Sequence, residues 1–196
     1  MLHTHIRRTL FILTAGTLLT APAVLLMGCG EHKAESPAAA QQTPAHSIDE
    51  RRAALTPYME ATTAYNSSML PLSLAVSTTI NDLRQGKHPT SIILPPLSKL
   101  SRALNAAHDV PEVKGVYPDV DAAADDLHTI LKELAPLADQ MENYYAAKAY
   151  TTDGCAQADE MTAQFLPLYD RFISAYDRLD AIVTDHYKEM RLAQID

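Results

Sequence analysis

The stretch that decides the fold is VDAAADDLHTILKELAPLADQMENYY, from Val120 to Tyr145. Its apolar positions recur at alternating steps of four and three residues, which is the period of one face of an α-helix. These positions are Val120, Ala124, Leu127, Leu131, Leu134, Ala138, Met141 and Tyr145. The spacing predicts one long helix that begins near residues 117–119. Asp119 and Asp121 would lie in its first turn, where the positive end of the helix dipole favours carboxylates.

A second long helical pattern precedes this one. Ser47-Ile48-Asp49-Glu50 has the form of a capping box, with a Ser N-cap and a Glu three residues later. The stripe that follows is Leu55, Tyr58 or Met59, Thr62, Tyr65, Met69, Leu72, Val76, Ile80 and Leu83. Gly86 fits a helix C-terminus. Pro57 and Pro71 fall inside the pattern, and because proline lacks a backbone donor we expect each to kink or split the helix.

Two more helices complete the pattern. A short helix is expected from Pro96 to near His108, with Leu97, Leu100 and Leu104 on one face. After a tight reversal at Thr151–Gly154, the last long stripe is Met161, Phe165, Leu168, Phe172, Tyr176, Leu179, Val183, His186 and Met190. No strand pattern occurs apart from the run 92–94. The fold class predicted is all-α, an elongated antiparallel bundle of three long helices and one short helix.

The N-terminal residues predict export and lipidation. Arg7 and Arg8 precede an apolar run that ends in Leu26-Met27-Gly28-Cys29. A basic start, an apolar core and a small residue at the cut are typical of a signal peptide. The tetrapeptide resembles the lipobox of bacterial lipoproteins, in which the cysteine thiol receives a diacylglycerol. We therefore predict a lipidated Cys29, with an uncleaved transmembrane helix and an ordinary signal peptide as the alternatives.

This prediction divides the chain into three parts. Residues 1–28 would be the lipoprotein signal peptide, and 29–46 would be the lipidated cysteine and a tether. The tether is rich in Ala, Pro, Gln and Ser and has no large apolar side chain, so it cannot bury enough surface to order itself. Residues 47–196 would form the helical domain. We expect the protein in the cell envelope, facing the periplasm, and on the outer membrane of a Gram-negative source because Gly30, and not Asp, follows Cys29.

The charge is concentrated in the second half of the chain. Residues 119–196 contain 16 acidic and six basic side chains, whereas residues 29–118 contain eight of each. Binding of nucleic acid or anionic headgroups requires clusters of Lys and Arg, so the composition argues against both. The acidic excess is interpreted as a solvated face that keeps the protein a monomer. The alternative is a surface for a basic partner or for loosely held cations.

Few residues indicate chemistry. Asp125 and His128 are three residues apart on one helix, as in di-iron bundles, but a second such pair is missing, so no metal site and no cofactor are expected. His186 lies on an apolar stripe and is interpreted as a hydrogen-bonded core histidine. Cys155 would be either a silent free thiol or an intermolecular link. No nucleophile motif or phosphate loop is present, and we expect that the protein is not an enzyme.

The most distinctive motif is YYAAKAYTTDG, from Tyr144 to Gly154. It contains paired tyrosines, a further tyrosine at Tyr150 and an aspartate at Asp153. Together with Tyr65-Asn66 in the first helix, it resembles the YiiG-like bacterial lipoproteins, a family built on an all-helical domain of unknown function. The resemblance implies the fold, the lipid anchor and possible interaction residues, but no activity. The tyrosines are expected to pack at a helix corner, with an exposed binding patch as the alternative.

From these observations we expect a structural or protein-interaction module, anchored to the membrane through lipid on Cys29 and meeting an unknown envelope partner. The alternative is a small-ligand or cation-binding lipoprotein.

Overall fold

The computed structural model describes residues 46–110 and 114–193. Its elements, in chain order, are α1 (Ile48–Met69), the 3-10 helix η1 (Leu70–Leu72), α2 (Ser73–Arg84), α3 (Leu97–His108), α4 (Pro118–Ala146), α5 (Tyr150–Asp153) and α6 (Ala156–Leu192). No strand occurs in these ranges, so the predicted all-α class is confirmed. The predicted signal peptide, Cys29 and nearly all of the tether lie outside the described residues.

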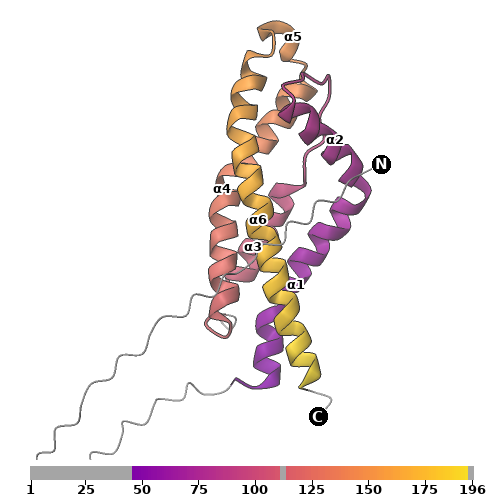
Figure 1. The fold of residues 1–196 in the computed structure, drawn as a ribbon. Coiled ribbons are helices and arrows are strands. Elements are labelled where there is room, and N and C mark those ends of the chain that lie inside the picture. Colours follow the sequence, from indigo (N-terminus) through magenta and orange to yellow (C-terminus); the bar gives the residue numbers. More distant parts are fainter. Residues whose placement is uncertain (1–45, 111–113, 194–196) are drawn as a thin grey trace, which may run out of the picture. The chain divides into compact units, whose positions relative to one another are not determined.

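Four helices close a ring around one core. α1 contacts α3 and α6, and α4 contacts the same two helices from the other side. Successive long segments run in opposite directions (Figure 1), which confirms the antiparallel bundle. The most extensive contact is between α4 and α6, which only the short reversal with α5 separates along the chain. Every buried residue that the structure describes lies within the compact unit of residues 43–196, so this unit contains its own core.

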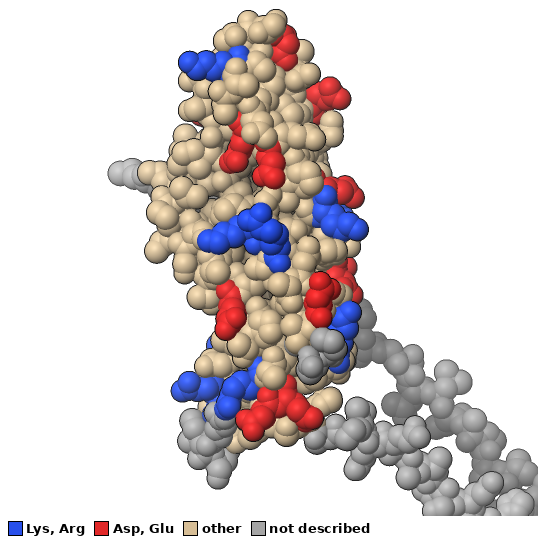
Figure 2. All heavy atoms as spheres, turned by 180° about the vertical axis from the view of Figure 1, so that it is seen from behind, with Lys and Arg blue, Asp and Glu red and all other residues tan. Residues whose placement is uncertain are grey.

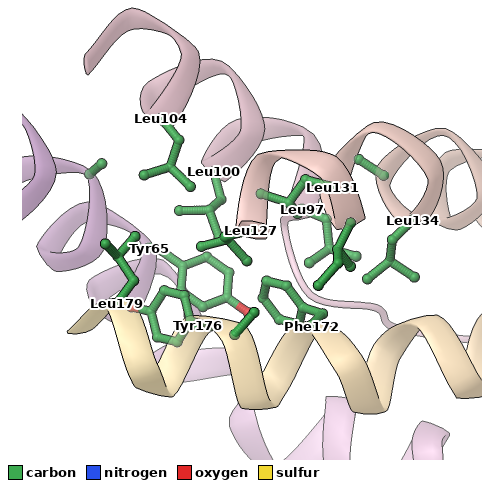
Figure 3. Close-up of a cluster of buried hydrophobic side chains, with 14 of the residues drawn as sticks. Tyr65, Leu97, Leu100, Leu104, Leu127, Leu131, Leu134, Phe172, Tyr176 and Leu179 are labelled. Atoms are coloured by element: carbon green, nitrogen blue, oxygen red, sulfur yellow. The ribbon is translucent and has the colours of Figure 1, made fainter. Parts of the chain in front are cut away.

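The core is built from the predicted stripes. All eight stripe positions of α4 are buried. Leu127 and Leu134 have no exposed surface, and neither has Phe172 of α6. Figure 3 shows these side chains meeting Leu100 of α3 and Tyr65 of α1 in one apolar cluster. Burial of this apolar surface is the main force that holds the four helices together.

The start of α1 has the predicted capping box. The Glu50 N–H donates to Ser47 Oγ at 3.2 Å, and the Ser47 N–H donates to Glu50 Oε2 at 2.7 Å. These two bonds satisfy donors that have no partner inside the helix.

Only one of the four prolines that fall within the long helical patterns interrupts its helix. Pro57, Pro136 and Pro167 lie inside continuous α-helices, whereas Pro71 lies in η1, between α1 and α2. The chain changes direction there (Figure 1), and we call residues 69–74 the elbow. The long first helix of the prediction is therefore two helices joined by the elbow.

The reversal between α4 and α6 is more structured than predicted. It contains the one-turn helix α5, flanked by three residues with positive φ: Lys148 (54°), Gly154 (63°) and Cys155 (72°). Positive φ is strained for residues other than glycine. Two non-glycine residues in this region mean that the surrounding contacts hold the turn in place.

Candidate functional site

The tyrosine corner is the first candidate site, defined here as Tyr144, Tyr145, Tyr150 and Asp153. Tyr144 lies at the end of α4, and its hydroxyl donates to Asp153 Oδ1 at 2.7 Å. The same carboxylate accepts the N–H groups of Cys155 and Gln157, at 3.0 and 3.2 Å. Asp153 therefore satisfies donors at the start of α6 as well as joining the two helices.

This hydrogen bond shifts the pKa values of its two partners in opposite directions. The hydrogen bond from Tyr144, together with those from the backbone, lowers the pKa of Asp153. Desolvation and the same hydrogen bond raise the pKa of Tyr144. The pair is thus held as a neutral phenol and a carboxylate at neutral pH. A tyrosine with a raised pKa is a poor proton donor to a substrate, so the arrangement favours a structural bond over acid catalysis.

The other two tyrosines complete the corner by packing. Tyr145 is 4% exposed, and its ring lies 5.4 Å from that of Tyr144 and 5.8 Å from that of Tyr150. The Tyr150 hydroxyl donates to the carbonyl of Thr90 at 3.3 Å, which fastens the α2–α3 connection to the corner. The hydroxyl of Tyr145 is buried and has no hydrogen-bond partner among the described residues. Tyr144 and Tyr145 are thus packed side chains and do not form an exposed patch.

A groove lies beside the corner, between α4 and α6. Its volume is about 440 Å³, and its lining residues are Leu137, Gln140, Asn143, Tyr144, Gln157, Glu160, Met161 and Gln164. Four of the eight carry amides and only one is charged. Amides both donate and accept hydrogen bonds, so this lining suits a neutral polar ligand such as a saccharide or a peptide backbone.

Sequence reasoning missed the groove. Its amides flank the apolar stripes, three residues apart on α4 (Gln140 and Asn143) and seven apart on α6 (Gln157 and Gln164). Both spacings place the pair on one helix face. That regularity is a detectable signal, but only the pairing of α4 with α6 brings the two sets together.

Tyr65 and Asn66 lie elsewhere, at the contact between α1 and α6. The ring of Tyr65 is 4.9 Å from that of Tyr176, and the Tyr176 hydroxyl donates to Asn66 Oδ1 at 2.7 Å. Burial raises the pKa of both tyrosines. They belong to the main core, whereas Tyr144 and Tyr145 form a separate cluster. The structure therefore divides the motif residues between two places.

His186 occupies the end of the bundle where α1 begins. Its Nε2 is 2.7 Å from Asp119 Oδ2 and its Nδ1 is 3.5 Å from Glu189 Oε2. Its ring lies 4.4 Å from that of Tyr117, whose hydroxyl accepts from Arg51 Nε at 2.9 Å. His186 is hydrogen-bonded, as predicted, but it is half-buried at the edge of the core. It joins α6 to the start of α4, and among the described residues it forms no hydrogen bond to a Ser, Thr or Cys.

The pair Asp125 and His128 is not brought into a metal-binding arrangement. Asp125 Oδ1 lies 3.6 Å from His108 Nδ1 of α3. In residues 46–110 and 114–193, no group of three or more His, Cys, Asp or Glu side chains is placed to hold a metal ion. Cys155 is half-buried and its thiol is free.

Comparison with known proteins gives a family and no activity. Residues 55–196 match the model of a family described as "Protein of unknown function (DUF3829)". No curated protein and no solved structure matches the chain. The match agrees with the expected domain of unknown function, while the closer resemblance to YiiG-like lipoproteins stays a prediction. None of the described helices combines the length and apolar character that crossing a membrane requires.

Proposed function

This chain belongs to the DUF3829 family, and from that premise we propose that it is a lipid-anchored bacterial envelope protein whose bundle is a non-catalytic interaction module. The observation that carries the proposal is Leu26-Met27-Gly28-Cys29 at the end of an apolar run. Two or three acyl chains on the N-terminal cysteine hold a protein firmly on a bilayer. With Gly30 after the cysteine, the outer membrane of a Gram-negative source is the proposed location.

The polar contacts of the bundle support a non-catalytic role. Asp153 and His186 make the two best-connected polar clusters, and each joins two or more helices. Their partners are carboxylates, phenols and backbone groups, which are suited to fixing helices and not to activating a nucleophile.

A second candidate function is binding of a small ligand, and the groove beside the tyrosine corner favours it. Glu160 is the only charged side chain in that lining. We therefore propose a neutral polar ligand, and not a cation, for this alternative. Figure 1 shows α5, and with it the tyrosine corner, at the opposite end of the bundle from the start of α1, and the groove lies beside this corner.

The anchor is tested by membrane fractionation. Wild type is compared with Cys29→Ala, and Cys155→Ala serves as the matched control for loss of a thiol. We expect wild type and the control to be in the membrane fraction, with an N-terminal peptide whose mass includes the acyl chains. If Cys29→Ala is processed and distributed as wild type is, the anchor is disproved.

The interaction module is tested by photo-crosslinking in intact cells. A crosslinker at Gln157 in the groove should capture the same partner as one at Gln164, whereas one at Glu133 on the exposed side of α4 should not. If a neutral sugar or peptide ligand is bound instead, it should raise the melting temperature of wild type and not of Gln140→Ala/Gln157→Ala. Absence of both results in membranes that hold the protein would contradict an interaction role for the groove.

A further inference from the structure

The elbow is the most exposed apolar feature in the described part of the chain. Leu70 and Leu74 are 78% and 79% exposed, more than any other large apolar side chain there. They lie four residues apart on either side of Pro71. Single exposed leucines are ordinary, but two that project together next to a proline leave apolar surface for a partner to bury.

The chain segment that contains the elbow is uncharged. From Ala61 to Asn81 the chain contains no Asp, Glu, Lys, Arg or His. The nearest acidic residues along the chain, Glu60 and Asp82, are ten residues before Leu70 and eight after Leu74, or about 15 and 12 Å along a helix. In Figure 2 the projection at the left, where the elbow lies, shows neither red nor blue atoms, and a blue group lies beside it. No acidic side chain of this segment would have to be desolvated at an apolar surface.

The neighbouring helix is basic. α3 contains Lys99 and Arg102, both exposed, and no acidic residue. Lys99 Nζ donates to Ser68 Oγ at 3.2 Å, which joins the basic helix to the end of α1, two residues before Leu70. The acidic excess of the chain belongs to residues 119–196, which form α4, α5 and α6. Asp139 of α4 lies next to α3 and accepts a hydrogen bond from Ser98 Oγ at 2.8 Å, so the basic surface is limited to the exposed side of α3 that carries Lys99 and Arg102.

We propose that the elbow and the exposed side of α3 form a second contact with the lipid bilayer. Leu70 and Leu74 enter the boundary between headgroups and acyl chains, and Lys99 and Arg102 meet anionic headgroups. The acidic composition of the whole chain argues against anionic lipid, but α3 and the segment from Ala61 to Asn81 contain no acidic residue. The α4–α6 groove then faces away from the membrane.

The proposed tether is long enough to permit this arrangement. In this respect the bilayer contact rests on the proposed function. The 18 residues from Cys29 to Ser47 span at most about 60 Å when extended. Leu70 lies 23 residues beyond Ser47, about 35 Å along α1. A bundle anchored at Cys29 can therefore lie on its α1–α3 side.

The test uses tryptophan fluorescence, because the chain contains no tryptophan. Leu74→Trp supplies a single indole at the elbow, and Ser174→Trp on exposed α6 is the matched control. Each is introduced into residues 43–196, which hold the whole described core, and into the full lipidated chain. Vesicles of phosphatidylethanolamine and phosphatidylglycerol in equal parts are added. Circular dichroism without lipid checks that each variant is folded as wild type is.

With residues 43–196 we expect a blue shift and quenching by brominated lipid for Leu74→Trp and none for Ser174→Trp. Changing Lys99 and Arg102 to Gln, or using phosphatidylcholine alone, should weaken vesicle binding about tenfold. Leu70→Ser, combined with the elbow probe, should weaken it by a similar factor, because less apolar surface is buried. This arm contains no Cys29, so its result is independent of the anchor.

Equal exposure of both indoles to an aqueous quencher, in the unanchored unit and in the vesicle-bound full chain, would overturn the bilayer contact. So would a shift of the elbow probe that depends on protein concentration and not on lipid, because it would identify a second copy of the chain as the occupant. Failure of the full chain to sediment with vesicles, beside a positive shift in residues 43–196, would instead count against the anchor alone.

Discussion

A proline has different effects in the α4–α6 hairpin and at the elbow. Pro136 lies in the middle of α4, and the helix continues through it; Pro71 lies between α1 and α2, and the helix ends. Both prolines are exposed. Around Pro136 the side chains at 134, 135, 137 and 138 are all buried, whereas η1 has no buried residue.

The difference is one of packing on both sides of the proline. Each proline removes one helical hydrogen bond and crowds the carbonyl four residues earlier. In α4, buried neighbours before and after Pro136 hold the helix against α3 and α6, and this packing offsets the loss. At the elbow the packing is weaker, because Met69 and Leu72 are only partly buried against the core, and the chain bends. A proline therefore ends a helix in this bundle where tertiary contacts do not hold both flanks.

Removing leucine side chains is the strongest test of this difference in packing between the hairpin and the elbow. Leu134→Ala should lower the free energy of unfolding by about 2–5 kcal/mol, because a fully buried side chain leaves a cavity between helices. Leu74→Ala makes the same chemical change at a side chain that is 79% exposed. It should change the free energy of unfolding by less than about 0.5 kcal/mol. Urea unfolding of residues 43–196 gives both values. Similar losses in the two variants would mean that the elbow is packed as the hairpin is.

Replacing each proline by alanine tests the same difference in packing, with a smaller expected change in the free energy of unfolding. Pro136→Ala should raise the free energy of unfolding by about 1–2 kcal/mol, because it restores a donor within a helix that is already formed. Pro71→Ala should increase helical circular dichroism at the elbow with little net change in stability. A straight helix there would move Val76 and Ile80 of α2 away from the core and offset the new hydrogen bond. A large gain from Pro71→Ala would contradict the role given to packing.

The smallest effect is expected at the reversal of the hairpin. Asp153→Asn keeps an acceptor for Tyr144 but removes the charge, so its cost at neutral pH should be below that of Leu134→Ala. The pKa of Asp153 in the folded state is below its ordinary value of 3.8, so its stabilisation is present above that pH and is lost as the pH falls through the folded pKa.

Thermal unfolding between pH 7 and about pH 2 checks this dependence. Wild type should lose stability in acid, and Asp153→Asn should lose less of it. Glu133→Gln, on the exposed side of α4, is the control and should follow wild type. Asp119, whose pKa is lowered by its contact with His186, adds to the same acid loss in all three proteins. Identical acid curves for wild type and Asp153→Asn would exclude a stabilising charge at the corner.

The fold was largely predictable because its signals are local. The eight-position stripe of α4, the capping box at Ser47 and the bounds of α3 depend on residues within a few positions of one another. The choice of Pro71 over Pro57 as the break depends on which flanks are packed in the folded bundle, and residue spacing does not contain that information.

The candidate site was predictable only in part, for the same reason. The motif from Tyr144 to Gly154 is contiguous, and its helix corner was predicted. The partner of His186 is Asp119, 67 residues away, and the amide groove combines residues of two helices. The basic side around Lys99 was missed because the charge was counted along the chain and not over the folded surface.

The four-helix arrangement has a mechanical consequence. α1 begins and α6 ends at the same end of the bundle, and the tyrosine corner lies at the other (Figure 1). A load between a tether at Ser47 and a partner at the corner acts along the helix axes, so it loads the helix interfaces in shear and strains many side-chain contacts at once. A load that separates the two termini peels α1 from α6 contact by contact. The bundle should therefore resist tension along its axis far better than the same force applied across its ends.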